Sequence, residues 1–225
     1  MTERQIEGIL REVTEEEVDF YADYGWVMMP RLVQPEFAEA LLRVGQCHVE
    51  ARTAAGDKRV GVGPKSGPTS PAHKLATDER AEPFRSLMFS ERMHRNAIRL
   101  TNRKRLKGVD VPMRYRVDIL SAKPPGAAGA SAHQDASEHG SDRVGELQFW
   151  LALAVVTPDM SAMRFVSKSH KEGPLGSTFN GDGDGGWKGQ GDLLKQYPGL
   201  LTELELCEFM NLDLSSLCSD QVACC

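Results

Sequence analysis

The sequence predicts an α+β fold with a β-rich core. Segments with the helical spacing of apolar residues lie in the first half of the chain, and short alternating or continuously apolar segments lie mainly in the second half. The chain has 225 residues, of which 40% are hydrophobic, and this is sufficient to form one core. We therefore predict a single domain over residues 1–225.

Three segments are predicted to be helical. Residues 14–24 begin at Thr14, which can cap a helix together with Glu17 three residues later, and Gly25 is suited to end it. Residues 34–53 and 82–101 follow, because their apolar residues recur every three or four positions. For the last of these helices the expected buried residues are Phe84, Leu87, Met88 and Ile98.

The predicted strands are short and are separated by loops rich in glycine and proline. Residues 55–72 and 180–191 are predicted loops, and the second of them has the aspartates that begin a calcium-binding EF-hand. Gly191 stands where that motif requires an acidic ligand, which excludes an EF-hand. The predicted strands are residues 26–29 (closed by Pro30), 113–120, 147–156 and 163–166.

Charge and hydropathy narrow the classes of partner. The formal net charge is -5, and the one basic cluster, residues 103–107, has no interleaved aromatic residue. We interpret it as a solvated helix end or loop, so no nucleic acid is expected as a partner. No apolar run reaches the ~20 residues that cross a membrane, and the N-terminus is polar. The prediction is a soluble, cytoplasmic protein without a membrane partner.

The five cysteines do not predict a zinc site. They stand at positions 47, 207, 218, 224 and 225, without a CxxC pair or a nearby histidine. A disulfide framework is not expected in an intracellular protein.

The tripeptide His133-Gln134-Asp135 carries the chemistry that the sequence predicts. In an extended segment the side chains at positions i and i+2 point to the same side, so His133 and Asp135 can both reach one metal ion. Mixed nitrogen and oxygen ligands suit iron(II), and two histidines with one carboxylate on one face leave positions open for a cosubstrate and oxygen. The spacing alone is a weak signal.

Several motifs surround this tripeptide in a fixed order. Residues 118–126 end in Lys-Pro-Pro-Gly, Phe149 to Leu153 form a "W-x-A-L" strand, and residues 164–173 read RFVSKSHKEG. Residues 23–30, DYGWVMMP, precede them. This ordered set, from about residue 14 to about residue 213, resembles the phytanoyl-CoA dioxygenase family.

The resemblance implies a fold and an activity. The implied fold is a double-stranded β-helix, a jelly-roll core similar to that of cupins, with the N-terminal helices packed outside. The implied activity is that of a dioxygenase that uses iron(II), 2-oxoglutarate and molecular oxygen, with ascorbate as the expected reductant. It hydroxylates a small organic substrate and converts 2-oxoglutarate to succinate and carbon dioxide. No segment of the chain identifies that substrate.

The resemblance also assigns roles to single residues. His133 and Asp135 match the iron ligands, while Trp150, Lys74 and Ile119 match positions that line or contact the 2-oxoglutarate pocket. Trp150 can equally be a core residue, and Lys74 a solvated surface lysine. Two further histidines are not expected to bind the metal: His170 belongs to a structural turn, and His139 lies in a polar loop.

The chain departs from the family pattern after about Ser215. The family's distal iron-binding histidine and the arginine that anchors 2-oxoglutarate are not found, since no histidine follows His170 and no arginine follows Arg164. We therefore expect residues 214–225 to be an aberrant tail from a truncated or mis-spliced gene, with the last strands missing, and we expect little turnover by this chain.

Three functions are compatible with the sequence. The first is an oxygenase, the second is an inactive binding protein on the same fold, and the third is a zinc hydrolase. The third would need an HxH or HExxH partner motif, and the sequence has none.

Overall fold

The computed structural model describes the N-terminal part of the chain almost continuously and the remainder in segments. The described residues are 1–54, 62–63, 67–68, 72–73, 82–102, 113–115, 118, 120–121, 132, 134, 147–157, 160, 162–173, 175, 195, 206–208 and 221–224. Their helices are α1 (Glu3–Glu7), α2 (Glu15–Tyr24), α3 (Pro35–Ala54), α4 (Phe84–Met88), α5 (Glu91–Asn102) and the 3-10 helix η2 (Ser169–Glu172). Their strands are β1 (Val27–Pro30), β2 (Val62–Gly63), β3 (Gly67–Pro68), β4 (Ala72–His73), β5 (Leu120–Ser121), β6 (Phe149–Leu151), β7 (Arg164–Val166), β8 (Leu206–Glu208) and β9 (Gln221–Cys224).

Helix α2 has the ends that the sequence predicts. The hydroxyl of Thr14 accepts a hydrogen bond from the Glu17 backbone N–H at 3.2 Å, and the Glu17 carboxylate accepts one from the Thr14 N–H at 2.8 Å. At the other end Gly25 adopts a left-handed conformation with φ 82, and its N–H donates to the Tyr21 carbonyl. These local bonds satisfy backbone groups that the first and last turns of a helix leave unpaired.

The predicted helix over residues 82–101 is divided into α4 and α5, which corrects the prediction of one continuous helix. The division falls at Ser90, whose hydroxyl accepts from the Met93 N–H at 3.1 Å and donates to the Leu87 carbonyl at 2.9 Å. A serine that bonds to nearby backbone groups in this way starts a new helix more readily than it continues an old one. The division also changes the buried face, to which Met93 and Leu100 contribute where Met88 and Ile98 were expected.

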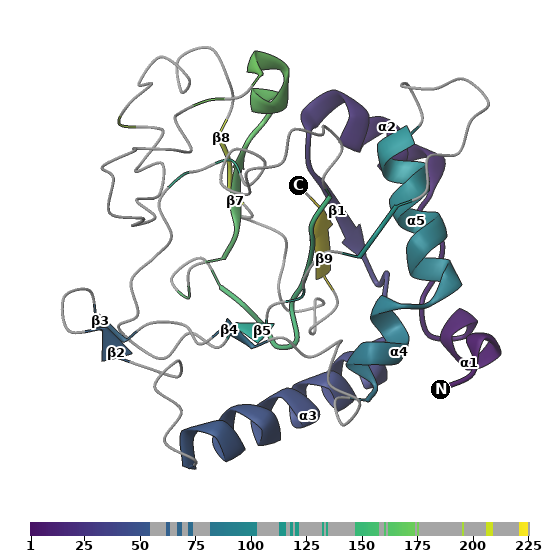
Figure 1. Cartoon of the computed structure of the whole chain (residues 1–225). Helices are drawn as coiled ribbons and strands as arrows, with labels where there is room; N and C mark the ends of the chain where they lie inside the picture. Colours follow the sequence, from purple (N-terminus) through teal and green to yellow (C-terminus); the bar gives the residue numbers. More distant parts are fainter. Residues whose placement is uncertain are drawn as a thin grey trace.

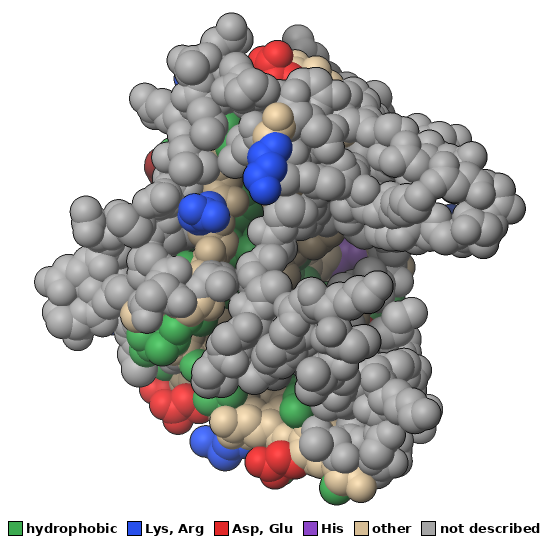
Figure 2. Space-filling view, turned by 90° about the vertical axis from the view of Figure 1, so that its left-hand side faces the viewer, with side chains coloured by type: hydrophobic (Ala, Val, Ile, Leu, Met, Phe, Trp, Pro, Cys, Tyr) green, Lys and Arg blue, Asp and Glu red, His purple; other side chains and the backbone are tan. Residues whose placement is uncertain are grey.

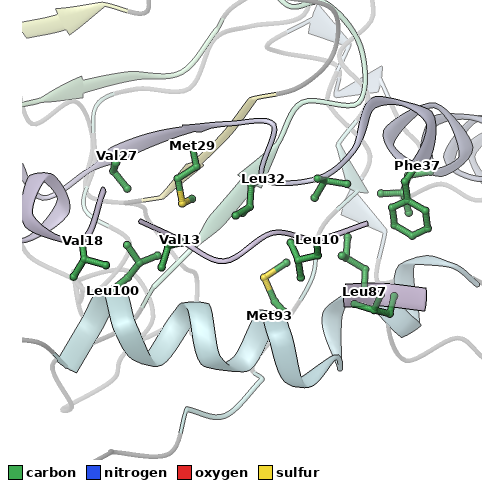
Figure 3. Packing of buried hydrophobic residues seen from close by; sticks show 13 residues of the cluster. Leu10, Val13, Val18, Val27, Met29, Leu32, Phe37, Leu87, Met93 and Leu100 are labelled. Atoms are coloured by element: carbon green, nitrogen blue, oxygen red, sulfur yellow. The ribbon is translucent and has the colours of Figure 1, made fainter. Parts of the chain in front are cut away.

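The hydrophobic core of the described residues lies between α5, the segment after α1, and β1 (Figure 3). Figure 3 shows side chains from these three layers pointing toward one another, with Leu100 and Met93 of α5 below Val13 and Leu10, and Met29 of β1 above them. Leu10 and Met29 are fully buried. The burial of apolar side chains is the main favourable contribution to folding, so the N-terminal helices form a packed unit.

One polar side chain crosses this core. Asn96 of α5 is fully buried, and its amide accepts from the Val13 N–H at 3.0 Å and donates to the Arg11 carbonyl at 2.9 Å. Both functions of the carboxamide are therefore satisfied, as a buried polar group requires.

The described strands form one three-stranded sheet and three two-stranded ribbons. The sheet has the order β1-β9-β6, with both neighbours antiparallel, and the ribbons pair β2 with β3, β4 with β5, and β7 with β8. Figure 1 shows α1, α2, α4 and α5 on one side of this sheet, with α3 below it and the ribbons on the other side. This arrangement of helices and antiparallel strands agrees with the predicted α+β class.

Several predicted strands differ in extent. Arg164–Val166 (β7) and Val27–Pro30 (β1) lie where strands were expected. Residues 113–115 are not in a strand, and the strand predicted over 147–156 contains only Phe149–Leu151. A continuous apolar run indicates burial, but it does not define where backbone pairing stops.

The segment after Ser215 contains one described strand, β9, while the expectation that the last jelly-roll strands are missing stays a prediction. Gln221–Cys224 form β9, which lies between β1 and β6 with Ala223 opposite Met28 on one side and Trp150 on the other. The physical reason is that both neighbouring strands offer unpaired backbone groups, which any extended segment can satisfy. The origin of this tail in a mis-spliced transcript stays a prediction.

Two further findings concern the outside of the molecule. Among the described residues, no helix is both long enough and apolar enough to span a bilayer. On the face in Figure 2, the coloured acidic and basic side chains of the described residues are scattered, and neither sign of charge gathers into one patch. The basic residues 103–107 lie outside the described part of the chain.

Candidate active site

The structure describes one of the five predicted site residues. Trp150 lies in β6, is half-buried, and stands opposite Ala223 of β9. His133, Asp135, Lys74 and Ile119 lie outside the described residues. Their neighbours Gln134, His73 and Leu120 are described.

Gln134, the central residue of the predicted metal motif, bonds to a distant segment. Its side-chain amide donates to the Gly173 carbonyl at 3.3 Å, and its side-chain oxygen accepts from the Leu175 N–H at 2.7 Å. All three residues are half-buried. The motif is therefore connected to the end of the RFVSKSHKEG turn, about forty residues later in the chain.

The RFVSKSHKEG turn is also attached to the C-terminal end of α2. The Trp26 indole N–H donates to the Ser167 hydroxyl at 3.0 Å, and the Lys168 N–H donates to the Tyr24 carbonyl at 2.8 Å. The rings of Trp26 and Phe165 stack with 5.8 Å between their centroids. Trp26 is 8% exposed and Ser167 is 5% exposed, so the hydrogen bond between them is shielded from water.

His170 packs on Gly25 at the same junction. A Cβ atom added to Gly25 would lie 2.7 Å from Cγ of His170, so only glycine leaves room for the imidazole ring. Burial of the ring against α2 lowers the pKa of His170, and Lys171 adds to this, while a hydrogen bond to the Ala22 backbone and the charge of Asp23 oppose it. His170 thus contacts the end of a helix, in agreement with its predicted place in a structural turn.

The ribbon of β4 and β5 contains His73 and Leu120, the described neighbours of Lys74 and Ile119 in the chain. In its antiparallel register Ala72 lies opposite Ser121, and His73 lies opposite Leu120. Leu120 packs against α3, where its two methyl carbons would lie 3.2 and 3.3 Å from a Cβ added at Gly45. The absence of a side chain at Gly45 therefore allows this ribbon to approach α3 closely.

The sequence did not predict a contact between Tyr115 and Asp118, two polar residues that precede β5 in the chain. The Tyr115 hydroxyl donates a short hydrogen bond to the Asp118 carboxylate. Burial raises the pKa of Tyr115 well above its ordinary value, and the hydrogen bond and negative charge of Asp118 raise it further. The two residues were predicted to alternate along one strand, and an odd spacing places side chains on opposite faces of a strand. Because residues 113–115 are not in a strand, the pair can meet.

Gln134 was also missed as a functional candidate. The available signal was its position between two predicted ligands, since neighbouring side chains of an extended segment point to opposite faces. Among the residues that the structure describes, no three histidine, cysteine or acidic side chains are close enough to form a metal site.

Comparison with known proteins identifies the family of this chain. A search of the curated proteins found no match to this chain. The family model for phytanoyl-CoA dioxygenase (PhyH) matches residues 21–197, a range that includes the predicted site residues and the turn on α2. The chain therefore belongs to the phytanoyl-CoA dioxygenase family, whose members are iron(II)- and 2-oxoglutarate-dependent dioxygenases.

Proposed function

We propose that this protein is an iron(II)- and 2-oxoglutarate-dependent dioxygenase that hydroxylates a small organic substrate within a double-stranded β-helix core. The observation that carries the proposal is the family match over residues 21–197, which contains every residue assigned to the site. In the reaction, one oxygen atom of O₂ enters the substrate as a hydroxyl group. The other enters succinate, and 2-oxoglutarate loses carbon dioxide.

His133 and Asp135 would bind the iron. An imidazole nitrogen and a carboxylate oxygen are ligand types that iron(II) accepts in these enzymes, and the donor set therefore fits the metal. The hydrogen bonds of Gln134 support this assignment, because they connect the motif to the folded part of the protein. When bound, iron(II) supplies the oxidising chemistry that amino-acid side chains lack.

Lys74, Ile119 and Trp150 would form the 2-oxoglutarate pocket. The described strands support this grouping, since His73, which precedes Lys74 in the chain, lies opposite Leu120, which follows Ile119. The ammonium group of Lys74 would then attract a carboxylate of 2-oxoglutarate, beside the apolar side chain of Ile119. Trp150, half-buried in β6, would contribute an apolar wall that excludes water.

A second candidate is a binding protein without turnover on the same fold. The observation that favours it is that, within residues 1–225, no histidine follows His170 and no arginine follows Arg164. Two protein ligands leave the iron without the third point of the facial arrangement. Binding of metal and 2-oxoglutarate without formation of succinate would be the signature of this function.

One assay separates the two candidates. The 225-residue chain is incubated with iron(II), ascorbate and 2-oxoglutarate, and succinate release is measured beside metal and 2-oxoglutarate binding. Succinate release that is lost in His133→Ala and Asp135→Ala supports the dioxygenase. Binding that depends on the same two residues, without succinate, supports the binding protein.

The control is His94→Ala, which removes an exposed histidine on α5. This variant is expected to behave as the wild type. Metal binding that is unchanged in both His133→Ala and Asp135→Ala would refute the assignment of the site. For an active protein, 2-oxoglutarate consumption with a panel of small organic compounds then identifies the substrate class.

A further inference from the structure

We propose that η2 and the residues at its two ends form a pH-sensitive latch, which is closed on α2 when His170 is neutral and opens when His170 is protonated. The latch comprises residues 168–173, and Figure 1 shows η2 as the green helical turn above β7. The inference does not depend on the proposed activity. It goes beyond that activity by assigning a conformational role to a histidine that is not expected to bind the metal.

The first step is that η2 lies between two residues with left-handed backbone conformations. Lys168 precedes it with φ 66, and Gly173 follows it with φ 77. Glycine adopts this conformation readily, but a lysine does not, so contacts elsewhere must hold Lys168 in it. Residues at the ends of an element are also the positions where hinge rotations occur. The latch therefore has a hinge position at each end.

The second step is the set of contacts that close the latch on the C-terminal end of α2. The Lys168 N–H donates to the Tyr24 carbonyl at 2.8 Å, and the Lys168 ammonium group lies 5.2 Å from the centroid of the Tyr24 ring. The His170 ring lies against Gly25, where an added Cβ would be 2.2 Å from Nδ1. The ring thus occupies space that exists only because residue 25 is a glycine.

The third step is the effect of charge on this contact. Contact with α2 removes water from the imidazole ring and lowers the pKa of His170. The hydrogen bond to the Ala22 backbone opposes this effect, Lys171 of η2 adds to it, and Asp23 of α2 opposes it. Because the lowered pKa belongs to the closed form, the open form binds protons more tightly. His170 keeps an exposed surface, so protons can reach it.

The fourth step connects the latch to a distant segment. Gly173, the second hinge position, accepts a hydrogen bond from the Gln134 amide at 3.3 Å, and the Leu175 N–H donates to the same side chain at 2.7 Å. Rotation about the backbone bonds of Gly173 changes the direction of its carbonyl group. Opening of the latch is therefore expected to weaken the contact with Gln134 as well.

Hydrogen exchange of the full 225-residue chain tests the inference. Exchange is measured between about pH 5 and pH 8, where histidine titrates, and is corrected for the intrinsic pH dependence of amide exchange. The Lys168 amide reports closure on α2, and the Leu175 amide reports the bond to Gln134. The amides of α5 report global unfolding. An NMR titration measures the pKa of His170 independently.

The protection of the Lys168 and Leu175 amides is expected to fall together as the pH decreases below 6.5, the ordinary value for histidine, while α5 keeps its protection. At full protonation the fall amounts to about tenfold for each pH unit by which the measured pKa of His170 lies below the ordinary value. The NMR titration therefore sets the size of the effect before the exchange is measured.

Three variants separate the latch from general stability. His170→Gln stays neutral and keeps an amide donor, so protection of the two amides is expected to become independent of pH. His94→Gln removes an exposed histidine of α5 and is expected to keep the wild-type response. Asp23→Asn removes a charge that favours the protonated ring in the closed form, so the response to pH is expected to become larger.

The opposite results overturn the inference. Protection at Lys168 that is independent of pH in the wild type, or that responds equally in His170→Gln, refutes the latch. A response at Lys168 without one at Leu175 refutes the connection to Gln134. An equal loss of protection in α5 shows that acid unfolds the whole protein. If His170→Gln does not fold, Asp23→Asn decides, because an unchanged or smaller response there contradicts the assigned role of charge.

Discussion

At the scale of single residues, Gly25 is the position where the chain has least freedom to change. It has φ 82, and its missing side chain leaves room for the His170 ring. The two requirements have different causes, since the first is a backbone preference and the second is a tertiary contact. Sequence indicated the first, because a glycine after a helix is a common ending. Only the fold brings His170 to that place.

Gly25→Ala is predicted to destabilise the protein by more than the ~1–2 kcal/mol that a left-handed conformation costs an ordinary residue. The excess arises because the new methyl group would meet the imidazole ring of His170. The free energy of unfolding in urea measures the effect. Gly8→Ala is the control, because Gly8 has φ -77 and its nearest neighbour would lie at an ordinary 3.5 Å. Equal losses in the two variants would contradict the prediction.

At the scale of elements, the RFVSKSHKEG turn (residues 164–173) joins α2 to Gln134 of the predicted metal motif. Its sequence was associated with a structural turn, but its partners were not predictable, because a contact between residues 26 and 167 depends on the whole chain path. The same holds for Gln134 and Leu175. The predicted capping box of Thr14 and Glu17 is confirmed, and it was predictable because all its atoms lie within one turn of helix.

The attachment of this turn is predicted to weaken in acid. The pKa of His170 is lowered in the folded protein, so between that value and the unfolded value of 6.5 the unfolded chain binds more protons. The stabilisation by His170 is therefore complete above pH 6.5 and is lost as the pH falls below it.

Urea unfolding of the wild type and of His170→Gln at a series of pH values measures this component. The difference in unfolding free energy between the two proteins is expected to shrink toward low pH. His94→Gln on α5 serves as the control. An NMR titration that places the pKa of His170 at or above 6.5 would disprove the prediction.

At the scale of the whole molecule, β9 joins strands that are far apart in the sequence. It comes from the last residues of the chain and lies between β1, near the N-terminus, and β6, which carries Trp150. The cysteine-rich composition of this segment concealed it, because strand pairing uses backbone groups that every residue supplies. The expectation that residues 214–225 are foreign to the fold is thus open to a direct structural test.

A chain that ends at Asp220 is predicted to lose protection in β1 and β6. The backbone N–H and C=O groups that pair with Gln221–Cys224 would be exposed to water, at a cost of about 1 kcal/mol for each hydrogen bond lost. Hydrogen exchange at Val27–Met29 and Phe149–Leu151 measures the loss. The amides of α5 serve as an internal control. Unchanged exchange in both strands would show that the tail does not belong to the sheet.

The sequence by itself determined the α+β class, the ends of α2 and the family, and it predicts the five residues assigned to the site. These conclusions depend on local periodicity and on the order of motifs, which need no knowledge of the chain path. The tertiary structure alone decided that Ser90 separates α4 from α5, that β9 lies between β1 and β6, and that Gln134 bonds to Gly173 and Leu175. The reason is physical: backbone and amide groups carry no signal of their partners, and only the packing of the core determines which of them meet.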